Sequence, residues 1–198
     1  GTRDPGAVDR EDSMTPAIEH GSAPPIAHGT WRVDPERSEV GFAAKSMWGL
    51  TTVRGAFGSC QGSLTLGARA VSGDLAIDAS SVDTGNRRRG RHLCSPDFLD
   101  TERHPRIVFR LGDLTSGDRA LTVAGALRIG DSDTEVELPI DVEQIPGDAV
   151  RLHASATISR AAAGVTWNWL GMIPDDTSLY ARITLVPAPD ASWEPQAS

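Results

Sequence analysis

Apolar and polar residues alternate along most of the chain between residues 30 and 187. For example, Val136 and Leu138 lie on either side of Glu137. A period of two is typical of β-strands, because successive side chains point to opposite faces. About eight such runs occur, separated by turn residues, and this arrangement predicts an antiparallel all-β domain.

Both a sandwich and a closed barrel would bury one face of each strand and leave the other in water. An eight-stranded barrel is just wide enough to hold one small ligand or to fill itself with side chains. Small residues on the apolar faces would leave room along the axis of a barrel: Ala44, Gly55, Gly125, Ala154 and Ala156. We therefore predict an eight-stranded antiparallel β-barrel with a cavity.

Residues 83–109 hold a long insertion between two strands. Its second half predicts a short helix at residues 95–99, because Ser95 can cap the free amides and Pro96 suits the first helical position. The helix should end before Pro105, since the residue preceding a proline is pushed into an extended conformation.

The insertion opens with a basic cluster of five residues: Arg87, Arg88, Arg89, Arg91 and His92. Guanidinium groups match phosphate oxygens in bidentate geometry, so the cluster could bind a phosphate or pyrophosphate head group. Alternatively, some arginines form salt bridges within the insertion and the rest are solvated. The carboxylates in question are Asp83, Asp97, Asp100 and Glu102. Runs of surface charge are usually solvated, which favours the second interpretation.

The basic cluster is a local exception, because 27 acidic residues outnumber 19 basic ones and give a formal charge of −8. That balance argues against non-specific binding to nucleic acid or to an anionic membrane. No apolar run approaches the ~20 residues of a spanning helix, and the first residues lack the hydrophobic centre of a secretion signal. A cytoplasmic location is expected, or a periplasmic or secreted one if a signal was removed.

The ends of the chain lack strand alternation. We expect residues 1–29 to form a disordered tail, in which Met14 could be the natural start after an expression tag, and residues 188–198 to form a second tail. The barrel domain is then expected at residues 30–187. Two cysteines, Cys60 and Cys94, are expected to be free thiols, although a disulfide stays open.

Two connections are rich in apolar residues and bounded by glycine or proline. The first holds Met47, Trp48 and Leu50, and the second holds Trp167, Trp169, Leu170, Met172 and Ile173. Exposed apolar patches are normally avoided, and methionine adapts to variable ligands, so these connections could form a portal or lid. The alternatives are a plug that closes one end of the barrel and a dimer contact.

Four residues of the insertion could supply metal ligands or a Cys–His pair: His92, Cys94, Asp97 and His104. Their spacing fits no zinc pattern, and the insertion holds a single cysteine. We therefore expect neither a metal site nor a catalytic residue here. His92 is expected to be a hydrogen-bonded anchor within the insertion.

Five segments together resemble the YceI-like family of lipocalin-like polyisoprenoid-binding proteins. They are W-R-V-D-P-E-R-S-E-V-G-F (31–42), T-T-V-R-G-A-F (51–57), the longest motif at 80–109, V-A-G-A-L-R-I (123–129) and I-S-R-A-A-A-G-V-T-W (158–167). The resemblance implies an extended lipocalin-like barrel whose apolar interior takes up a long isoprenoid or similar amphiphile. It implies no cofactor and no catalytic residues.

The chain departs from the family pattern at a few positions. The family usually has an acid where Gly90 stands, a basic residue where Cys94 stands and often a histidine where Ser46 stands. Its usual Asp-Phe pair is replaced by Ala162 and Ala163. These changes are expected to cluster at the cavity mouth.

These observations predict a binder that sequesters or carries a polyisoprenoid, prenyl quinone or fatty chain. The predicted ligand contacts are Phe42, Trp48, Phe57, Arg89, Arg91, His92, Phe109, Trp167, Trp169 and Met172. The expected partners are a hydrophobic small molecule or lipid and a second copy of the chain in a homodimer, with no nucleic acid and no membrane span. Two alternatives stay open: an enzyme that uses His92, Asp97 or Cys94, and an interaction protein that presents two of its tryptophans.

Overall fold

The computed structural model describes residues 26–46, 50–67, 70–116, 121–159, 161 and 175–188. This part of the chain forms eleven antiparallel strands, one α-helix and two short 3-10 helices. The strands are β1 (Gly29–Val33), β2 (Glu39–Ser46), β3 (Thr51–Phe57), β4 (Cys60–Leu66), β5 (Val71–Asp78), β6 (Val82–Asp83), β7 (Arg106–Ser116), β8 (Leu121–Ile129), β9 (Ser132–Ile145), β10 (Ala149–Ser159) and β11 (Asp176–Pro187). The helices are α1 (Arg87–Cys94), η1 (Pro35–Arg37) and η2 (Ala79–Ser81).

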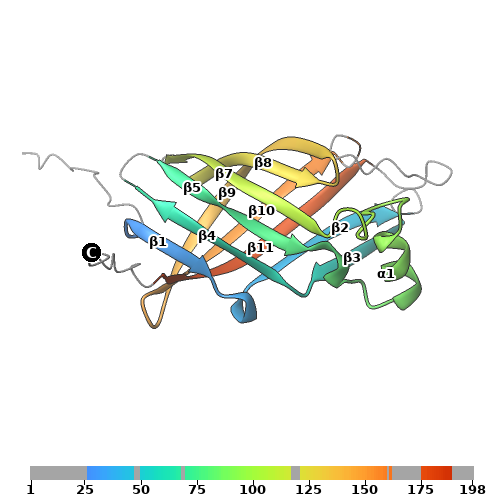
Figure 1. Cartoon of the computed structure of the whole chain (residues 1–198), viewed down its shortest axis with the longest axis horizontal. Helices are drawn as coiled ribbons and strands as arrows, with labels where there is room; N and C mark the ends of the chain where they lie inside the picture. The colour runs from blue at the N-terminus through green and yellow to red at the C-terminus, as the bar shows by residue number, and fades with distance from the viewer. Residues whose placement is uncertain are drawn as a thin grey trace, which may run out of the picture.

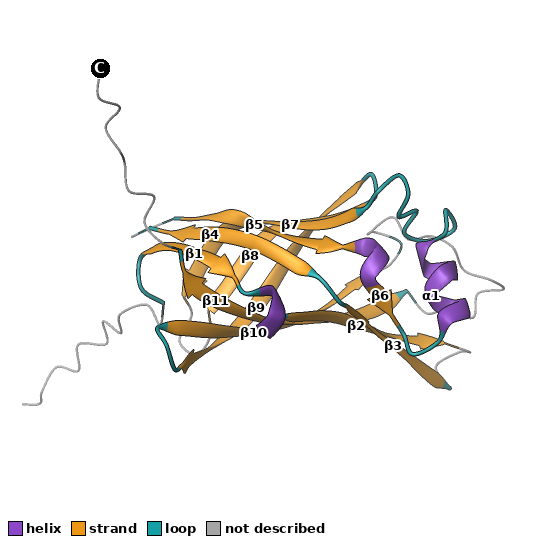
Figure 2. Ribbon diagram, turned by 60° about the horizontal axis from the view of Figure 1, so that its bottom comes forward, coloured by secondary structure: helices purple, strands orange, loops and turns teal. Residues whose placement is uncertain are grey.

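Eight of the strands close into a barrel, as predicted (Figure 1). The ring runs β1-β4-β5-β7-β8-β9-β10-β11, and pairing of β1 with β11 closes it. β11 pairs with β2 along its first half and with β1 along its second half. β2, β3 and β6 extend the wall toward α1, which lies at one end of the barrel (Figure 2). Among the described helices, none is long and apolar enough to cross a membrane.

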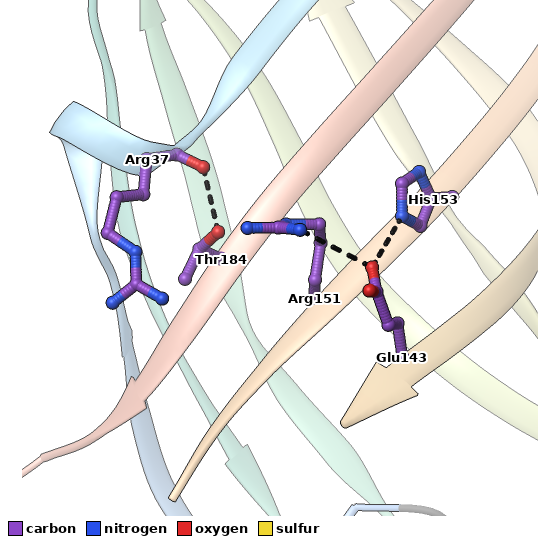
Figure 3. A network of polar contacts seen from close by, with 5 residues as sticks. All are labelled: Arg37, Glu143, Arg151, His153 and Thr184. Carbon is purple, nitrogen blue, oxygen red and sulfur yellow. Dashed lines mark hydrogen bonds and ion pairs between the residues drawn. The ribbon is translucent and has the colours of Figure 1, made fainter. Parts of the chain in front are cut away.

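Hydrogen bonds from Thr184 hold the place where β11 changes partner. Its backbone N–H donates to Ser38 Oγ at 2.9 Å, and its hydroxyl donates to the Arg37 carbonyl at 2.7 Å (Figure 3). Thr184 is completely buried under η1. These bonds fix the turn between β1 and β2, so that the two strands occupy successive halves of β11. Nearby, Glu143 accepts from Arg151 and contacts His153, which ties β9 to β10.

A dry core fills the end of the barrel opposite α1. Trp31 pairs with Leu64 across β1 and β4, and Val150 pairs with Leu185 across β10 and β11. All four side chains are buried, and each such burial contributes about 1.5–3 kcal/mol. Ile26 is also buried, so packing begins four residues before the domain start expected at residue 30.

The helix of the insertion lies earlier than predicted. α1 spans Arg87–Cys94, and Asn86 caps it by accepting a hydrogen bond from the backbone N–H of Arg89 at 3.0 Å. Ser95 ends the helix instead of starting it, because its N–H and hydroxyl both donate to the His92 carbonyl. The prediction of a helix at residues 95–99 was therefore wrong. Asn and Ser are comparable N-caps, and the arginines after Asn86 are better helix formers than the turn residues after Ser95.

Candidate functional site

A cavity of about 370 Å³ lies inside the barrel at the α1 end. Sites that take one small organic molecule usually measure roughly 300–1,000 Å³. Most of the lining is apolar: Val40, Phe42, Ala44, Val53, Phe57, Ile77, Leu93, Phe98, Leu99, Ile107, Phe109, Leu127, Ile129, Val136, Leu138, Ala154, Ala156, Ile158, Leu179 and Ala181. The remaining lining residues are Gly41, Lys45, Arg89, His92, Ser155, Thr177 and Tyr180.

The strand ends show where the cavity opens. Lys45 lies near the end of β2, Ile129 ends β8, Ile158 lies near the end of β10, and Thr177 lies near the start of β11. All four line the cavity, and all four strand ends face α1 (Figures 1 and 2). The cavity therefore lies between the dry core and the helix.

Two phenylalanine rings lie flat against the cavity wall because the facing residues are glycines. A Cβ placed on Gly55 would lie 2.6 Å from the Phe42 ring, and one placed on Gly125 would lie 2.7 Å from the Phe109 ring. Each ring thus occupies space that a side chain on the neighbouring strand would fill. This arrangement provides aromatic surface without blocking the lumen.

Another part of the cavity wall is built from methyl groups. Ala154 on β10 pairs with Ala181 on β11, and Ala44 and Ala156 lie nearer the mouth. Three of these four alanines were identified from the sequence as small residues that would leave space in a barrel. Small side chains on three adjacent strands keep this side of the lumen open.

The helix and the turn that follows it form the wall at the mouth. Leu93, Phe98 and Leu99 contribute apolar side chains, and the N–H of Leu99 donates to the Leu93 carbonyl at 3.0 Å. The His92 ring packs edge-on against Phe98 with centroids 5.1 Å apart, and its Nε2 lies 3.5 Å from Asp97 Oδ2. His92 thus holds the turn against the helix.

A second histidine ties the insertion to the barrel. His104 Nε2 lies 3.5 Å from Asp131 Oδ2 in the turn between β8 and β9. His92 and His104 therefore have separate carboxylate partners. Within the described ranges, no three side chains of His, Cys, Asp or Glu gather in a group that could hold a metal ion.

Both cysteines are free thiols. Cys60 is buried in the core, and burial raises the pKa of its thiol. A raised pKa lowers the thiolate fraction and makes the thiol less reactive. Cys94 is half-buried at the end of α1.

The structure places five of the predicted ligand contacts in the cavity wall: Phe42, Phe57, Arg89, His92 and Phe109. Arg91 is exposed on α1 and is not among the described residues that line the cavity. Four others, Trp48, Trp167, Trp169 and Met172, lie outside the described residues, as do most residues of the two connections expected to form a portal.

Sequence reasoning missed many aliphatic residues of the wall, including Leu127, Val136 and Leu138. Their alternation identified them as inward-facing, but depth along the barrel axis depends on strand register. It also missed Thr177, whose buried hydroxyl lines the cavity without a hydrogen-bond partner among the described residues.

The chain was compared with known protein families. Residues 31–185 match the family model of the YceI-like domain. The chain belongs to the YceI-like domain family. The resemblance noted in the sequence motifs is thereby confirmed.

Related YceI-like sequences are bacterial. A UPF0312 protein of Pseudomonas aeruginosa and Protein YceI of Escherichia coli O157:H7 are each 27% identical to this chain over 104 residues. Each alignment covers 50% of this chain and 54% of the relative. This chain therefore spans about half the length of the relatives that it matches.

Two solved structures share the fold. BcnA of Burkholderia cenocepacia superposes with a TM-score of 0.69 at 23% identity, covering 77% of this chain and 98% of that one. A polyisoprenoid binding domain from Saccharophagus degradans, implicated in plant cell wall breakdown, gives a TM-score of 0.67 at 14% identity, covering 80% of this chain and 98% of that one.

Proposed function

We propose that this YceI-like protein binds one hydrophobic amphiphile in its barrel cavity and sequesters or carries it. The observation that supports this function is the cavity itself, whose wall is apolar on the inner faces of β2, β3 and β7–β11. The name of the Saccharophagus degradans neighbour, a polyisoprenoid binding domain, agrees with a guest of this chemical class.

The hydrophobic effect is sufficient for such binding. At ~25 cal/mol per Å², burying about 400 Å² of an apolar chain contributes roughly 10 kcal/mol before the costs of association. The cavity volume of about 370 Å³ favours a single guest chain. The hydroxyl of Thr177, which has no hydrogen-bond partner among the described residues, offers a polar contact inside a mostly apolar wall.

The test is extraction of the purified protein with organic solvent, together with native mass spectrometry. We expect a co-purified lipid, or a mass increase of one guest when farnesol is added to protein stripped of lipid. A neutral fluorescent probe such as N-phenylnaphthylamine should bind the stripped protein and be displaced by farnesol. Empty spectra together with no probe binding would rule the function out.

The second candidate is an enzyme that uses the cavity as a reaction chamber. It is favoured by one observation: His92 lines the cavity and lies 3.5 Å from Asp97, an arrangement that can orient a general base. Chromatography of the guest after incubation separates the two functions. A carrier returns its guest unchanged, whereas an enzyme returns a modified product that is lost in His92→Gln.

A further inference from the structure

The charged residues of the cavity wall all have one sign. Among the described lining residues, Lys45 and Arg89 are cations and none is an aspartate or glutamate. The whole chain, by contrast, carries a formal charge of −8. The positive charge at the mouth is therefore a local feature, opposite in sign to the net charge of the protein.

The arginines of α1 are not neutralised by the carboxylates around them. Arg87, Arg88, Arg89 and Arg91 form no ion pair with any described residue. Three of the four carboxylates considered in the sequence analysis have other partners. Asp97 faces His92, Asp100 faces Arg103, and Asp83 accepts from the backbone N–H of Gly85. The salt bridges that would have explained these arginines as structural anchors are not formed.

Of these four arginines, Arg89 is the one that also lies in the cavity wall. Its neighbours along the wall are Leu93 and His92 on the same helix, and below them the lining becomes apolar. The Arg89 guanidinium is exposed at the mouth, and its charge strengthens a hydrogen bond to an anion while salt screens that bond. It also presents two parallel N–H donors that match a carboxylate or phosphate.

We propose that the cavity takes its guest tail first and that Arg89 binds an anionic oxygen head group at the mouth. This inference depends on the proposed function and names the class of its ligand, an amphiphile with a phosphate or carboxylate head. The apolar chain fills the lumen beneath Phe42 and Phe109. Lys45, an exposed residue near the end of β2, adds positive charge without the bidentate geometry.

The experiment compares guests that share a tail and differ in the head group. Farnesol is compared with farnesyl monophosphate, and hexadecanol with palmitate, each by displacement of N-phenylnaphthylamine from the stripped protein. We expect each anionic guest to bind at least about tenfold more tightly than its alcohol, the effect of one charge-assisted hydrogen bond. This preference should shrink as salt concentration rises, because the site is partly exposed.

Variants locate the preference. Arg89→Gln should bring the affinities of the anionic guests close to those of the matching alcohols. Arg89→Lys should keep part of the preference for anionic guests, since lysine keeps the positive charge but lacks the two parallel N–H donors. Arg32→Gln removes an exposed arginine from β1 at the closed end and should leave all affinities unchanged. Circular dichroism and the melting temperature establish that each variant is folded.

The outcomes separate this inference from the function on which it depends. If neither guest of a pair binds, the proposed function fails. If alcohol and anion bind equally well to the wild type, the head-group site is refuted and the carrier function stands. A preference that survives in Arg89→Gln but disappears in Lys45→Gln would refute the assignment to Arg89. If phosphate alone is preferred, the head group is a phosphate, and if palmitate is preferred as well, the site accepts either oxyanion.

Discussion

Replacing Gly55 with alanine should reduce the space inside the cavity with little effect on the fold. The new Cβ would lie 2.6 Å from two atoms of the Phe42 ring and 3.1 Å from Thr84 Cγ2. Ordinary carbon contacts begin at 3.4 Å, so the ring must move by 0.8 Å (3.4 − 2.6) or more. Phe42 lines the cavity, and the ring is free to move toward the lumen.

The loss of binding free energy depends on how much of the guest chain the displaced Phe42 ring excludes. If it excludes about two methylenes, at ~0.8 kcal/mol for each, binding weakens by ~1.6 kcal/mol, or roughly 15-fold. Alanine is better than glycine in a strand by about 0.5–1 kcal/mol, while overpacking costs about 1–3 kcal/mol, so the net loss of stability is about 0–2.5 kcal/mol. Because the ring can move into the lumen, we expect a loss of stability at the low end of that range.

The assay is probe displacement by farnesol, with urea denaturation of the same samples. Gly58→Ala is the matched control, because a Cβ there lies 3.7 Å from its nearest neighbour, the Ser81 carbonyl oxygen. It should bind as the wild type does. The double variant Gly55→Ala/Phe42→Leu removes the displaced ring and should recover most of the affinity. Wild-type affinity in Gly55→Ala, or no recovery in the double variant, would show that the Phe42 ring does not limit the cavity.

Three further predictions concern stability and reactivity. Thr184→Val leaves the Arg37 carbonyl without its 2.7 Å hydrogen bond and should lower the free energy of unfolding by about 1–3 kcal/mol in urea, whereas Thr184→Ser should stay close to the wild type. Asn86→Ala removes the N-cap of α1 and should cost about 1 kcal/mol, seen as faster hydrogen exchange within the helix; unchanged exchange would contradict the helix boundaries. Iodoacetamide should label Cys94 before Cys60, because burial raises the pKa of the Cys60 thiol. Equal labelling rates of the two cysteines in the folded protein would contradict this order. Because the pKa of the Cys60 thiol is higher in the folded than in the unfolded protein, the free energy of unfolding should also fall as the pH rises through the ordinary thiol range.

The strands could be predicted because their pattern is local. Val136 and Leu138 face the lumen and the glutamate between them is exposed. A period of two forces that division whatever the strand pairs with. The same reasoning identified Ala44, Ala154 and Ala156 as inward-facing small residues before any pairing was known.

The helix boundary was mispredicted because two capping residues competed within one insertion. Asn86 and Ser95 can each cap a helix, and both are used, one at the start of α1 and one at its end. Choosing between them requires the contacts that follow. The turn after the helix is held by His92, Asp97 and Phe98, whose geometry no local pattern specifies.

By itself, the sequence determined the class of fold, the inward faces of the strands and the presence of a basic insertion, since each of these depends on residues close together in the chain. Only the tertiary structure decided that β1 closes onto β11, which lies about 150 residues further along the chain. That closure sets the register, and the register decides which inward residues form the dry core and which line the cavity. It also decided that Arg89 forms no ion pair with any carboxylate of the described residues, because the partner of a charged side chain depends on which segments the folded barrel brings within reach.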